Sequence, residues 1–253
     1  MKKQILLFML GIFSLSGAVA QTKIIAHRGF WDTENSAQNS ITSLYKAAEA
    51  GCYGAEFDVQ TTSDGVLIVY HDNDIEDMHI PDTPYEKLRD FKLKNGEILP
   101  TLDQYLIHAK NCPDIKLILE IKAGKLPEEK VKSFVNSVLE HVDKHQLQGR
   151  TEYIAFSMDI CKELRRRRPD VDIAYLNGDA SPMQLKEIGL TGPDYHHSKF
   201  TENTDLVNQA HQQGLIVNVW TVNDSALMKK LIGMGVDYIT TDKPLVLRQL
   251  LER

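Results

Sequence analysis

Cysteine is scarce in this chain, with only Cys52, Cys112 and Cys161 among 253 residues. The number is odd, and each cysteine lies in or beside an apolar segment, which predicts buried free thiols. This scarcity argues against a disulfide framework. It also argues against a metal site built from a cluster of thiolates.

Positive charge is also scarce, since the formal net charge is −6 and the isoelectric point is near 5.8. A nucleic-acid partner is therefore not expected, because such binding needs a basic surface that displaces phosphate counterions. The one dense basic run is Arg165 to Arg168, which follows Met158 to Leu164 and precedes Pro169. This arrangement predicts the cationic last turn of a helix.

Long apolar runs are absent except near the start of the chain. Met1-Lys2-Lys3 precedes the apolar stretch Ile5 to Phe13, and the small residues Ala18-Val19-Ala20 follow it. This pattern predicts a signal peptide over residues 1–20, cut before Gln21, and an exported mature chain that is periplasmic or secreted. A retained anchor is the alternative, but the stretch is short for a membrane span and no cysteine follows to accept lipid, so no stable membrane anchor is expected.

Residues 21–253 alternate between strand-like and helix-like segments without a low-complexity linker. Such alternation predicts a single α/β domain, a parallel sheet closed as a (β/α)8 TIM barrel with its site at the C-terminal ends of the strands. The expected strands are Lys23 to Ala26, Ala55 to Val59, Leu67 to Tyr70, Lys116 to Ile121, Tyr153 to Phe156, Asp172 to Leu176, Leu215 to Trp220 and Val236 to Thr240.

The helices are marked by apolar spacing and by their ends. The clearest helix opens at Pro127, carries apolar residues at 3.6-residue spacing and stops at Gly149. Ser181-Pro182 starts another, Gly214 ends one, and Asp224-Ser225 caps one that ends near Gly235.

Asp64-Gly65 is a tight hairpin signal, and a short turn joins only antiparallel strands. Folding back about this turn is expected to set His71 roughly opposite Asp58. The next segment, residues 74–102, has weak periodicity and several acids and prolines, which predicts a small insertion at the barrel mouth. Gly192 to His197 is a further strand-like piece, so the strand count is open by one.

Acids end two of the apolar strands. Glu56 and Asp58 project from one face of their strand, and Glu120 shares a face with Lys122. Two carboxylates on one face repel each other unless a cation joins them. Glu120 and Lys122 alone are also compatible with a plain ion pair at the barrel rim.

A set of motifs spread over nearly the whole mature chain resembles the glycerophosphodiester phosphodiesterase family, a branch of the phospholipase-C-like TIM barrels. The motifs are His27-Arg28-Gly29, Gln38-Asn39-Ser40, Glu56-x-Asp58, Asp64-Gly65, His71-Asp72, Glu120-x-Lys122, Trp220-Thr221-Val222-Asn223, Gly235-Val236-Asp237 and Thr241-Asp242-Lys243-Pro244.

The resemblance implies hydrolysis of glycerophosphodiesters to glycerol 3-phosphate and an alcohol. It implies that His27 and His71 are the catalytic acid and base, and that Glu56, Asp58 and Glu120 hold a divalent cation. Substrate and phosphate contacts are expected from a further set: Arg28, Lys122, Asn39 and Trp220. Trp220 is equally compatible with a wall for the glycerol and with core packing.

The residue types suit this chemistry. Oxygen ligands without a cysteine cluster favour Mg²⁺ or Ca²⁺ over zinc. Arg28 and Lys122 neutralise a diester, and two histidines of near-neutral pKa can exchange a proton with the nucleophile and the leaving group. The resemblance further implies that a neighbouring hydroxyl of the substrate is the attacking group and forms a cyclic phosphate that water then opens.

One position departs from the family pattern, because Gln38 stands where a glutamate is usual beside the asparagine. If that glutamate balances the charge of the metal, the affinity or the metal preference differs here. Glu34-Asn35 is a nearby mimic of the motif, although its distance from Glu56 fits less well than that of Asn39.

Three rival functions differ in testable ways. A phosphodiester-binding protein needs cations but not two histidines, and a zinc amidohydrolase barrel needs a His-x-His pair that the first strand lacks. A phospholipase acting on intact lipid needs an apolar rim, whereas the insertion is mostly acidic and polar. His196 and His197 are expected at the surface or behind the site, pointing oppositely. The alcohol, the preferred cation and the oligomeric state are not specified by the sequence.

Overall fold

The computed structural model describes residues 21–123 and 126–252. The predicted signal peptide, residues 1–20, lies outside the described residues. Among the helices that are described, none combines the length and the apolar character that a membrane crossing requires.

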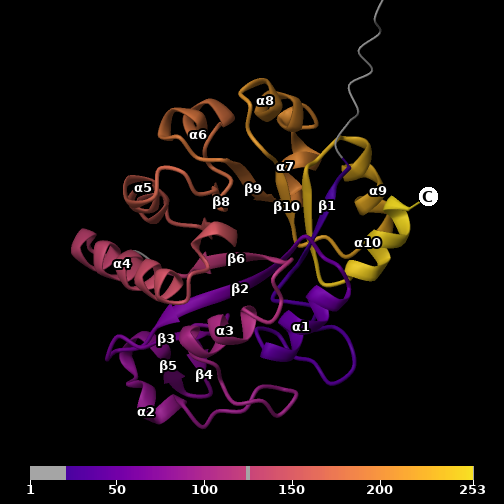
Figure 1. Ribbon diagram of the computed structural model, residues 1–253. Coiled ribbons are helices and arrows are strands. Elements are labelled where there is room, and N and C mark those ends of the chain that lie inside the picture. The colour runs from indigo at the N-terminus through magenta and orange to yellow at the C-terminus, as the bar shows by residue number, and fades with distance from the viewer. Residues whose placement is uncertain (1–20, 124–125, 253) are drawn as a thin grey trace, which may run out of the picture.

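Eight parallel strands form a closed barrel, because β1 pairs with both β11 and β2 (Figure 1). This confirms the predicted (β/α)8 TIM barrel. The order around the barrel is β1, β11, β10, β9, β8, β7, β6 and β2. The strands are β1 Lys23–Ala26, β2 Gly54–Thr61, β6 Lys116–Ile121, β7 Thr151–Ala155, β8 Ile173–Tyr175, β9 Gly192–His196, β10 Asn218–Trp220 and β11 Tyr238–Thr241.

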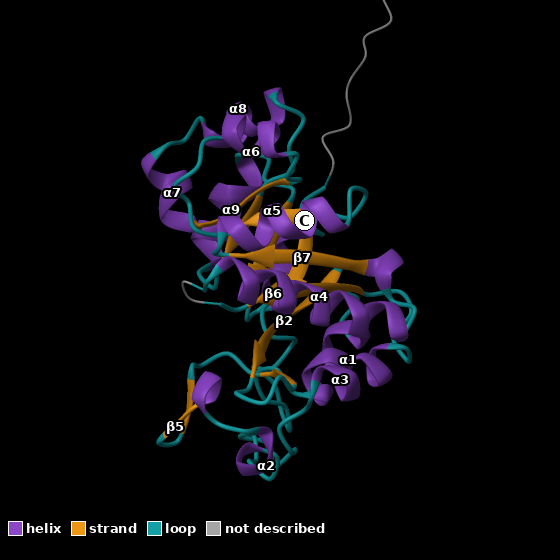
Figure 2. Cartoon of the chain, turned by 90° about the vertical axis from the view of Figure 1, so that its left-hand side faces the viewer, coloured by secondary structure: helices purple, strands orange, loops and turns teal. Residues whose placement is uncertain are grey.

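Helices surround the barrel and cover the outward face of its strands (Figure 2). They are α1 Ile41–Glu49, α3 Leu102–Ala109, α4 Glu128–Lys144, α5 Met158–Arg167, α6 Pro182–Ile188, α7 His197–Glu202, α8 Leu206–Gln212, α9 Ser225–Gly233 and α10 Pro244–Leu251.

Most predicted helix ends are confirmed. The arginine run closes α5, Pro182 opens α6 inside a capping box, and the Asp224 side chain caps α9. The expected end of α4 at Gly149 is wrong, since the helix stops at Lys144. Gln146 takes a left-handed backbone with φ of 59°, which no α-helix continues through.

The core lies mainly between strands and helices. Phe57 of β2 points outward and stacks on Tyr105 of α3, with ring centroids 4.4 Å apart and both side chains fully buried. Because neighbouring residues of a strand alternate, Glu56 and Asp58 face the barrel interior. The three cysteines are buried free thiols, as predicted.

The structure settles the number of barrel strands, which the sequence left open by one. Gly192–His196 is barrel strand β9, whereas β3, Leu67–Val69, is an antiparallel partner of β2 outside the barrel. The hairpin prediction is confirmed, but its register is off by one residue. Val59 pairs with Val69, so the Tyr70 amide donates to the Asp58 carbonyl at 3.0 Å, and His71 lies just beyond.

The segment after β3 forms a separate small lobe at the lower end of the molecule (Figures 1 and 2). It contains β4 Asp74–Ile75, β5 Met78–His79 and α2 Tyr85–Leu88. An apolar cluster holds the lobe together and joins it to β3 and to the loop before α1; its members are Ala37, Ile68, Ile75, Ile80, Leu88, Leu93 and Leu99. The lobe therefore packs directly against the edge of the barrel.

Candidate active site

A cavity of about 110 Å³ opens at the C-terminal ends of the barrel strands. Seven of the nine predicted site residues line it: His27, Arg28, Glu56, His71, Glu120, Lys122 and Trp220. The other two, Asp58 and Asn39, lie directly against these residues. The strands that end here bring together segments almost 200 residues apart in sequence, from the end of β1 to β10.

Three carboxylates meet at the cavity floor. Ligand oxygens of Glu56, Asp58 and Glu120 lie within 4.8 Å of one another, and all three side chains are buried. Their meeting follows from strand register, because Asp58 of β2 pairs with Glu120 of β6. Glu56 lies two residues earlier on the same face of β2.

Burial and mutual repulsion shift the pKa values of these three acids. Burial, together with the other two carboxylates, raises the pKa of Glu56 well above its usual range. Burial and the Asp58 carboxylate raise the pKa of Glu120 to about 8. Burial also opposes ionisation of Asp58, but Lys122, His71, Arg28 and the Asn39 amide outweigh it and lower the pKa of Asp58.

Lys122 is a cation inside the cluster. Its Nζ lies 3.4 Å from Asp58 Oδ1 and 3.2 Å from Glu120 Oε1. Burial alone lowers the pKa of Lys122, but Glu120 and Asp58 outweigh it and raise that pKa. Lys122 and the neighbouring Arg28 carry two positive charges against three acids, and three converging carboxylates suit a hard divalent cation.

Backbone geometry explains the His27-Arg28-Gly29 motif. Arg28 takes a left-handed φ of 53°, and its amide donates to Glu56 Oε2 at 2.7 Å. Gly29 also takes a positive φ, and a Cβ at this position would lie 2.3 Å from Ser43 Oγ. The tight turn thus aims the Arg28 guanidinium back at the carboxylates, with Nε 3.7 Å from Asp58.

Gln38 and Asn39 hold this turn from the other side. The Arg28 guanidinium donates to Gln38 Oε1 at 2.7 Å, a neutral partner where a glutamate would cancel the charge. Asn39 is buried and donates to Asp58 Oδ2 at 2.8 Å, while the Asp58 amide donates back to Asn39 at 3.1 Å. Asn39, and not Asn35 of the nearby mimic, thus positions the acid. A phosphate contact from Asn39 stays a prediction.

Both histidines border the cavity, and each is oriented by a carboxylate. His27 Nδ1 lies 2.8 Å from Asp242 Oδ1, which leaves Nε2 for a ligand. Burial opposes ionisation of Asp242, but hydrogen bonds from His27, Asn223 and Trp31 outweigh it and lower the pKa of Asp242.

His71 is the more open of the two, with 35% of its side chain exposed. Its Nδ1 lies 2.7 Å from Asp72 Oδ1. Burial, opposed by the Asp58 carboxylate, gives His71 a pKa below its usual value, so the neutral imidazole is favoured at neutral pH.

Trp220 lines the cavity and also packs against a small apolar cluster of the barrel interior. Its Nε1 donates to the Asp194 carbonyl at 2.8 Å, and its ring meets Phe156 edge-on at 5.5 Å between centroids. His196 packs on the same tryptophan at 5.3 Å. The expectation that His196 and His197 point oppositely is wrong, because β9 ends at His196, α7 begins at His197, and the two rings lie 4.0 Å apart.

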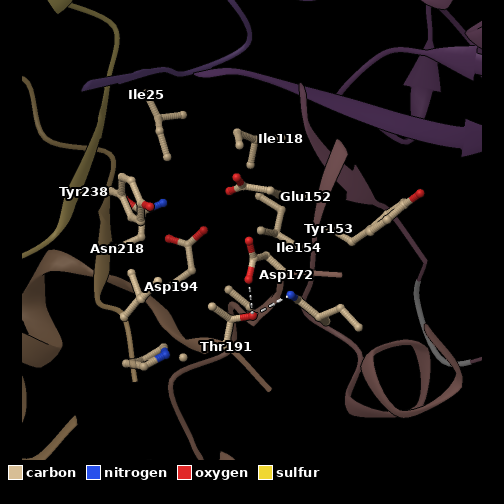
Figure 3. A pocket seen from close by; sticks show the side chains of 15 residues that line it. Ile25, Ile118, Glu152, Tyr153, Ile154, Asp172, Thr191, Asp194, Asn218 and Tyr238 are labelled. Carbon is tan, nitrogen blue, oxygen red and sulfur yellow. Dashed lines mark hydrogen bonds between the residues drawn. The ribbon is translucent and has the colours of Figure 1, made fainter. Parts of the chain in front are cut away.

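Asp194 is a buried acid that sequence reasoning missed. It lines the active-site cavity and also a second space of about 40 Å³ deeper in the barrel. Figure 3 shows its carboxylate pointing into this deeper space, among Asn218, Tyr238 and Asp172. Oδ1 has no hydrogen-bond partner, and burial raises the pKa of Asp194 to about 7. The alternation of side chains along β9 could have indicated this acid, because Asp194 and His196 lie on the same face of that strand.

We expect Asp194→Asn to stabilise the metal-free protein at pH 8. The folded-state pKa near 7 lies above the unfolded value of 3.8, so the native state binds more protons between these values and stability falls as pH rises through this window. The gain is on the order of 2 to 4 kcal/mol at pH 8, and it disappears near pH 4. Urea unfolding at both pH values in chelator measures it, with exposed Asp170→Asn as the control. A variant less stable than wild type at pH 8 would contradict it.

Comparison with known proteins agrees with this geometry. The fold and the site define a TIM-barrel protein that brings buried acids and two histidines together at the C-terminal ends of its strands. The model of the glycerophosphoryl diester phosphodiesterase family matches residues 27–246. The chain belongs to this family of enzymes.

Individual relatives span nearly the whole chain. A glycerophosphodiester phosphodiesterase from Caldanaerobacter subterraneus is 27% identical over 92% of this chain and 99% of its own length. The crystal structure of a glycerophosphodiester phosphodiesterase from Parabacteroides distasonis is 49% identical, covers 92% of this chain and 98% of its own, and superposes with a TM-score of 0.90. A phosphodiesterase from Oleispira antarctica, solved with its product sn-glycerol-3-phosphate, shares the fold with a TM-score of 0.79 at 22% identity, 92% coverage of this chain and 98% of its own.

Proposed function

We propose that this chain hydrolyses glycerophosphodiesters to glycerol 3-phosphate and an alcohol, with a divalent cation and two histidines. The observation that carries the proposal is one cavity lined by Glu56, Glu120 and the two carboxylate-oriented histidines, with the buried Asp58 clustered against its two acids. Membership of the family, and the name of the 49% identical Parabacteroides distasonis enzyme, support the substrate class.

In this proposal Glu56, Asp58 and Glu120 hold Mg²⁺ or Ca²⁺, which supplies Lewis acidity to a phosphoryl oxygen when bound. Arg28 and Lys122 neutralise the remaining charge of the diester from either side of Asp58. Gln38 is a neutral partner of Arg28, so the anionic group beside this guanidinium is Asp58 and no glutamate at position 38 adds a second one.

His27 and His71 divide the proton transfers in this scheme. One removes the proton from the attacking hydroxyl, and the other protonates the departing alkoxide. Asp242 and Asp72 fix the ring orientations that these transfers need. A neighbouring hydroxyl of the glycerol is the attacking group, and water then opens the cyclic phosphate.

The exposed apolar side chains favour a soluble substrate over intact lipid. Among the described residues, the large hydrophobics that are exposed are Ile98, Ile107, Phe156, Met183, Leu245 and Val246. Of these, only Phe156 borders the cavity. A lipid-binding rim would need a contiguous apolar patch around the mouth.

A product assay tests the proposal. Glycerophosphocholine incubated with the protein and Mg²⁺ or Ca²⁺ should yield glycerol 3-phosphate and choline, and chelator should stop the release. Binding of the diester without any product would instead support the phosphodiester-binding protein and overturn hydrolysis.

We also propose that the chain is exported and begins at Gln21 once mature, on the signal pattern of residues 1–20. Mass spectrometry of the protein purified from its native host should find the N-terminus at Gln21. Detection of Met1 in the purified protein would contradict export with cleavage.

A further inference from the structure

A second and larger cavity, of about 440 Å³, lies beside the candidate active site. We call it the side groove. Its walls come from the loop between β1 and α1 and from both ends of the insertion lobe. The lining residues are Trp31, Asp32, Thr33, Ser36, Ala37, Gln38, Asn39, Tyr70, His71, Asp72, Phe91, Lys92, Leu93 and Lys94.

His71 connects the two cavities, since it lines both of them, whereas His27 lines only the inner one. Gln38 of the groove wall accepts a hydrogen bond from Arg28 of the inner cavity. A diester whose phosphorus lies at the carboxylate cluster can therefore extend one of its substituents past His71 into the groove.

The acids of the groove already have cationic or histidine partners. Asp32 forms an ion pair with Lys243, and the Asp72 carboxylate bonds to His71. Lys92 and Lys94 differ from them, because over the described residues neither lysine has a carboxylate within ion-pair distance. The groove thus holds two lysines without an ion-pair partner among the described residues, beside one carboxylate, Asp72, whose partner His71 favours the neutral form.

Lys92 and Lys94 are exposed and line the groove on either side of Leu93, which also lines it and is buried in the apolar cluster of the lobe. The insertion, residues 74–102, carries seven acids against four bases, which makes the positive groove wall a local exception.

The rest of the wall suits a polyol. Trp31, Tyr70 and Phe91 offer aromatic surface, and Tyr70 meets Phe91 edge-on with centroids 5.7 Å apart. Aromatic faces pack against the carbon atoms of a polyol, while hydroxyl groups of Thr33 and Ser36 are available for hydrogen bonds.

We propose that the side groove binds the alcohol portion of the diester, and that Lys92 and Lys94 select an alcohol that carries its own phosphate group. The proposal rests on the proposed function and specifies its substrate class. The shared chemistry is a glycerophosphodiester whose departing alcohol carries a second anionic phosphate, towards which a lysine ammonium acts as a point charge.

A matched substrate pair tests the proposal. Glycerophosphoglycerol has a neutral leaving alcohol, and glycerophosphoglycerophosphoglycerol extends the same alcohol by one charged phosphodiester. Wild type should show the higher kcat/KM on the longer substrate. The Lys92→Gln/Lys94→Gln variant should lower the ratio of the two kcat/KM values about tenfold, and added salt should lower it in wild type. Lys87→Gln, on the same lobe but outside the groove, is the control and should keep the wild-type ratio.

The outcomes distinguish failure of the groove proposal from failure of the proposed function. If the neutral substrate is hydrolysed but the ratio is the same in wild type and in the double variant, the proposed function stands and the groove proposal is overturned. If neither substrate yields glycerol 3-phosphate, the proposed function fails and the groove proposal fails with it. A drop in the ratio for Lys87→Gln as large as for the double variant would also overturn it, because the effect would then be general surface charge.

Discussion

Replacing Glu56 with glutamine should abolish diester hydrolysis and release the divalent cation. Glu56 is buried among carboxylates whose charges only a cation can join, and its Oε2 also accepts the Arg28 amide at 2.7 Å. Glutamine keeps the shape and the hydrogen bond but removes one anionic ligand. Because Lewis-acid stabilisation contributes several kcal/mol, we expect a loss of roughly a thousandfold or more in kcat.

The measurement pairs turnover with metal content in the same sample. Glu152→Gln is the matched control, since Glu152 is a largely buried acid of the same barrel that bonds Tyr53 at the opposite end of the strands. This variant should keep both metal and activity. Normal metal stoichiometry with normal turnover in Glu56→Gln would exclude the ligand assignment.

The second large effect distinguishes the roles of His27 and His71 by comparing substrates with different leaving groups. Choline and ethanolamine are poor alkoxide leaving groups that need a proton, whereas nitrophenolate leaves without one. One of His27→Ala and His71→Ala should therefore lose about 10² to 10⁴ in kcat on glycerophosphocholine yet keep much more activity on a nitrophenyl phosphodiester. The variant without its base should fail on both substrates.

The side groove identifies which variant to expect. Since His71 borders the space proposed for the alcohol, His71→Ala should be the one that nitrophenolate rescues. Rescue of His27→Ala instead would place the alcohol on the other side of the phosphorus. Equal and large losses on both substrates for both variants would rule out a one-acid, one-base scheme.

Much of the site could be predicted because strand alternation is a strong constraint. Glu56 and Asp58 share a face by spacing alone, and their strand is apolar enough to be buried on both sides. Parallel pairing with the strand of Glu120 then brings the three acids to one level. The barrel itself follows from the alternation of strand and helix, although the place of β9 was left open and the short strands β4 and β5 were not expected.

The contacts that were missed depend on distant segments. His27 is oriented by Asp242, which is 215 residues away, and no periodicity reports such a pairing. The register of the β2–β3 hairpin is one residue off because the turn has more residues than the Asp64-Gly65 pair alone. The side groove arises where two loops meet, and loop conformation is not encoded by a repeating pattern.

A metal add-back titration tests the central claim most directly. The protein is freed of metal with chelator, Mg²⁺ or Ca²⁺ is returned in measured equivalents, and release of glycerol 3-phosphate from glycerophosphocholine is followed. The account predicts no release without an ion and a rate that rises with bound ion until one divalent cation is held per chain at the Glu56, Asp58 and Glu120 cluster. Full release of glycerol 3-phosphate by protein shown to contain no metal would contradict it.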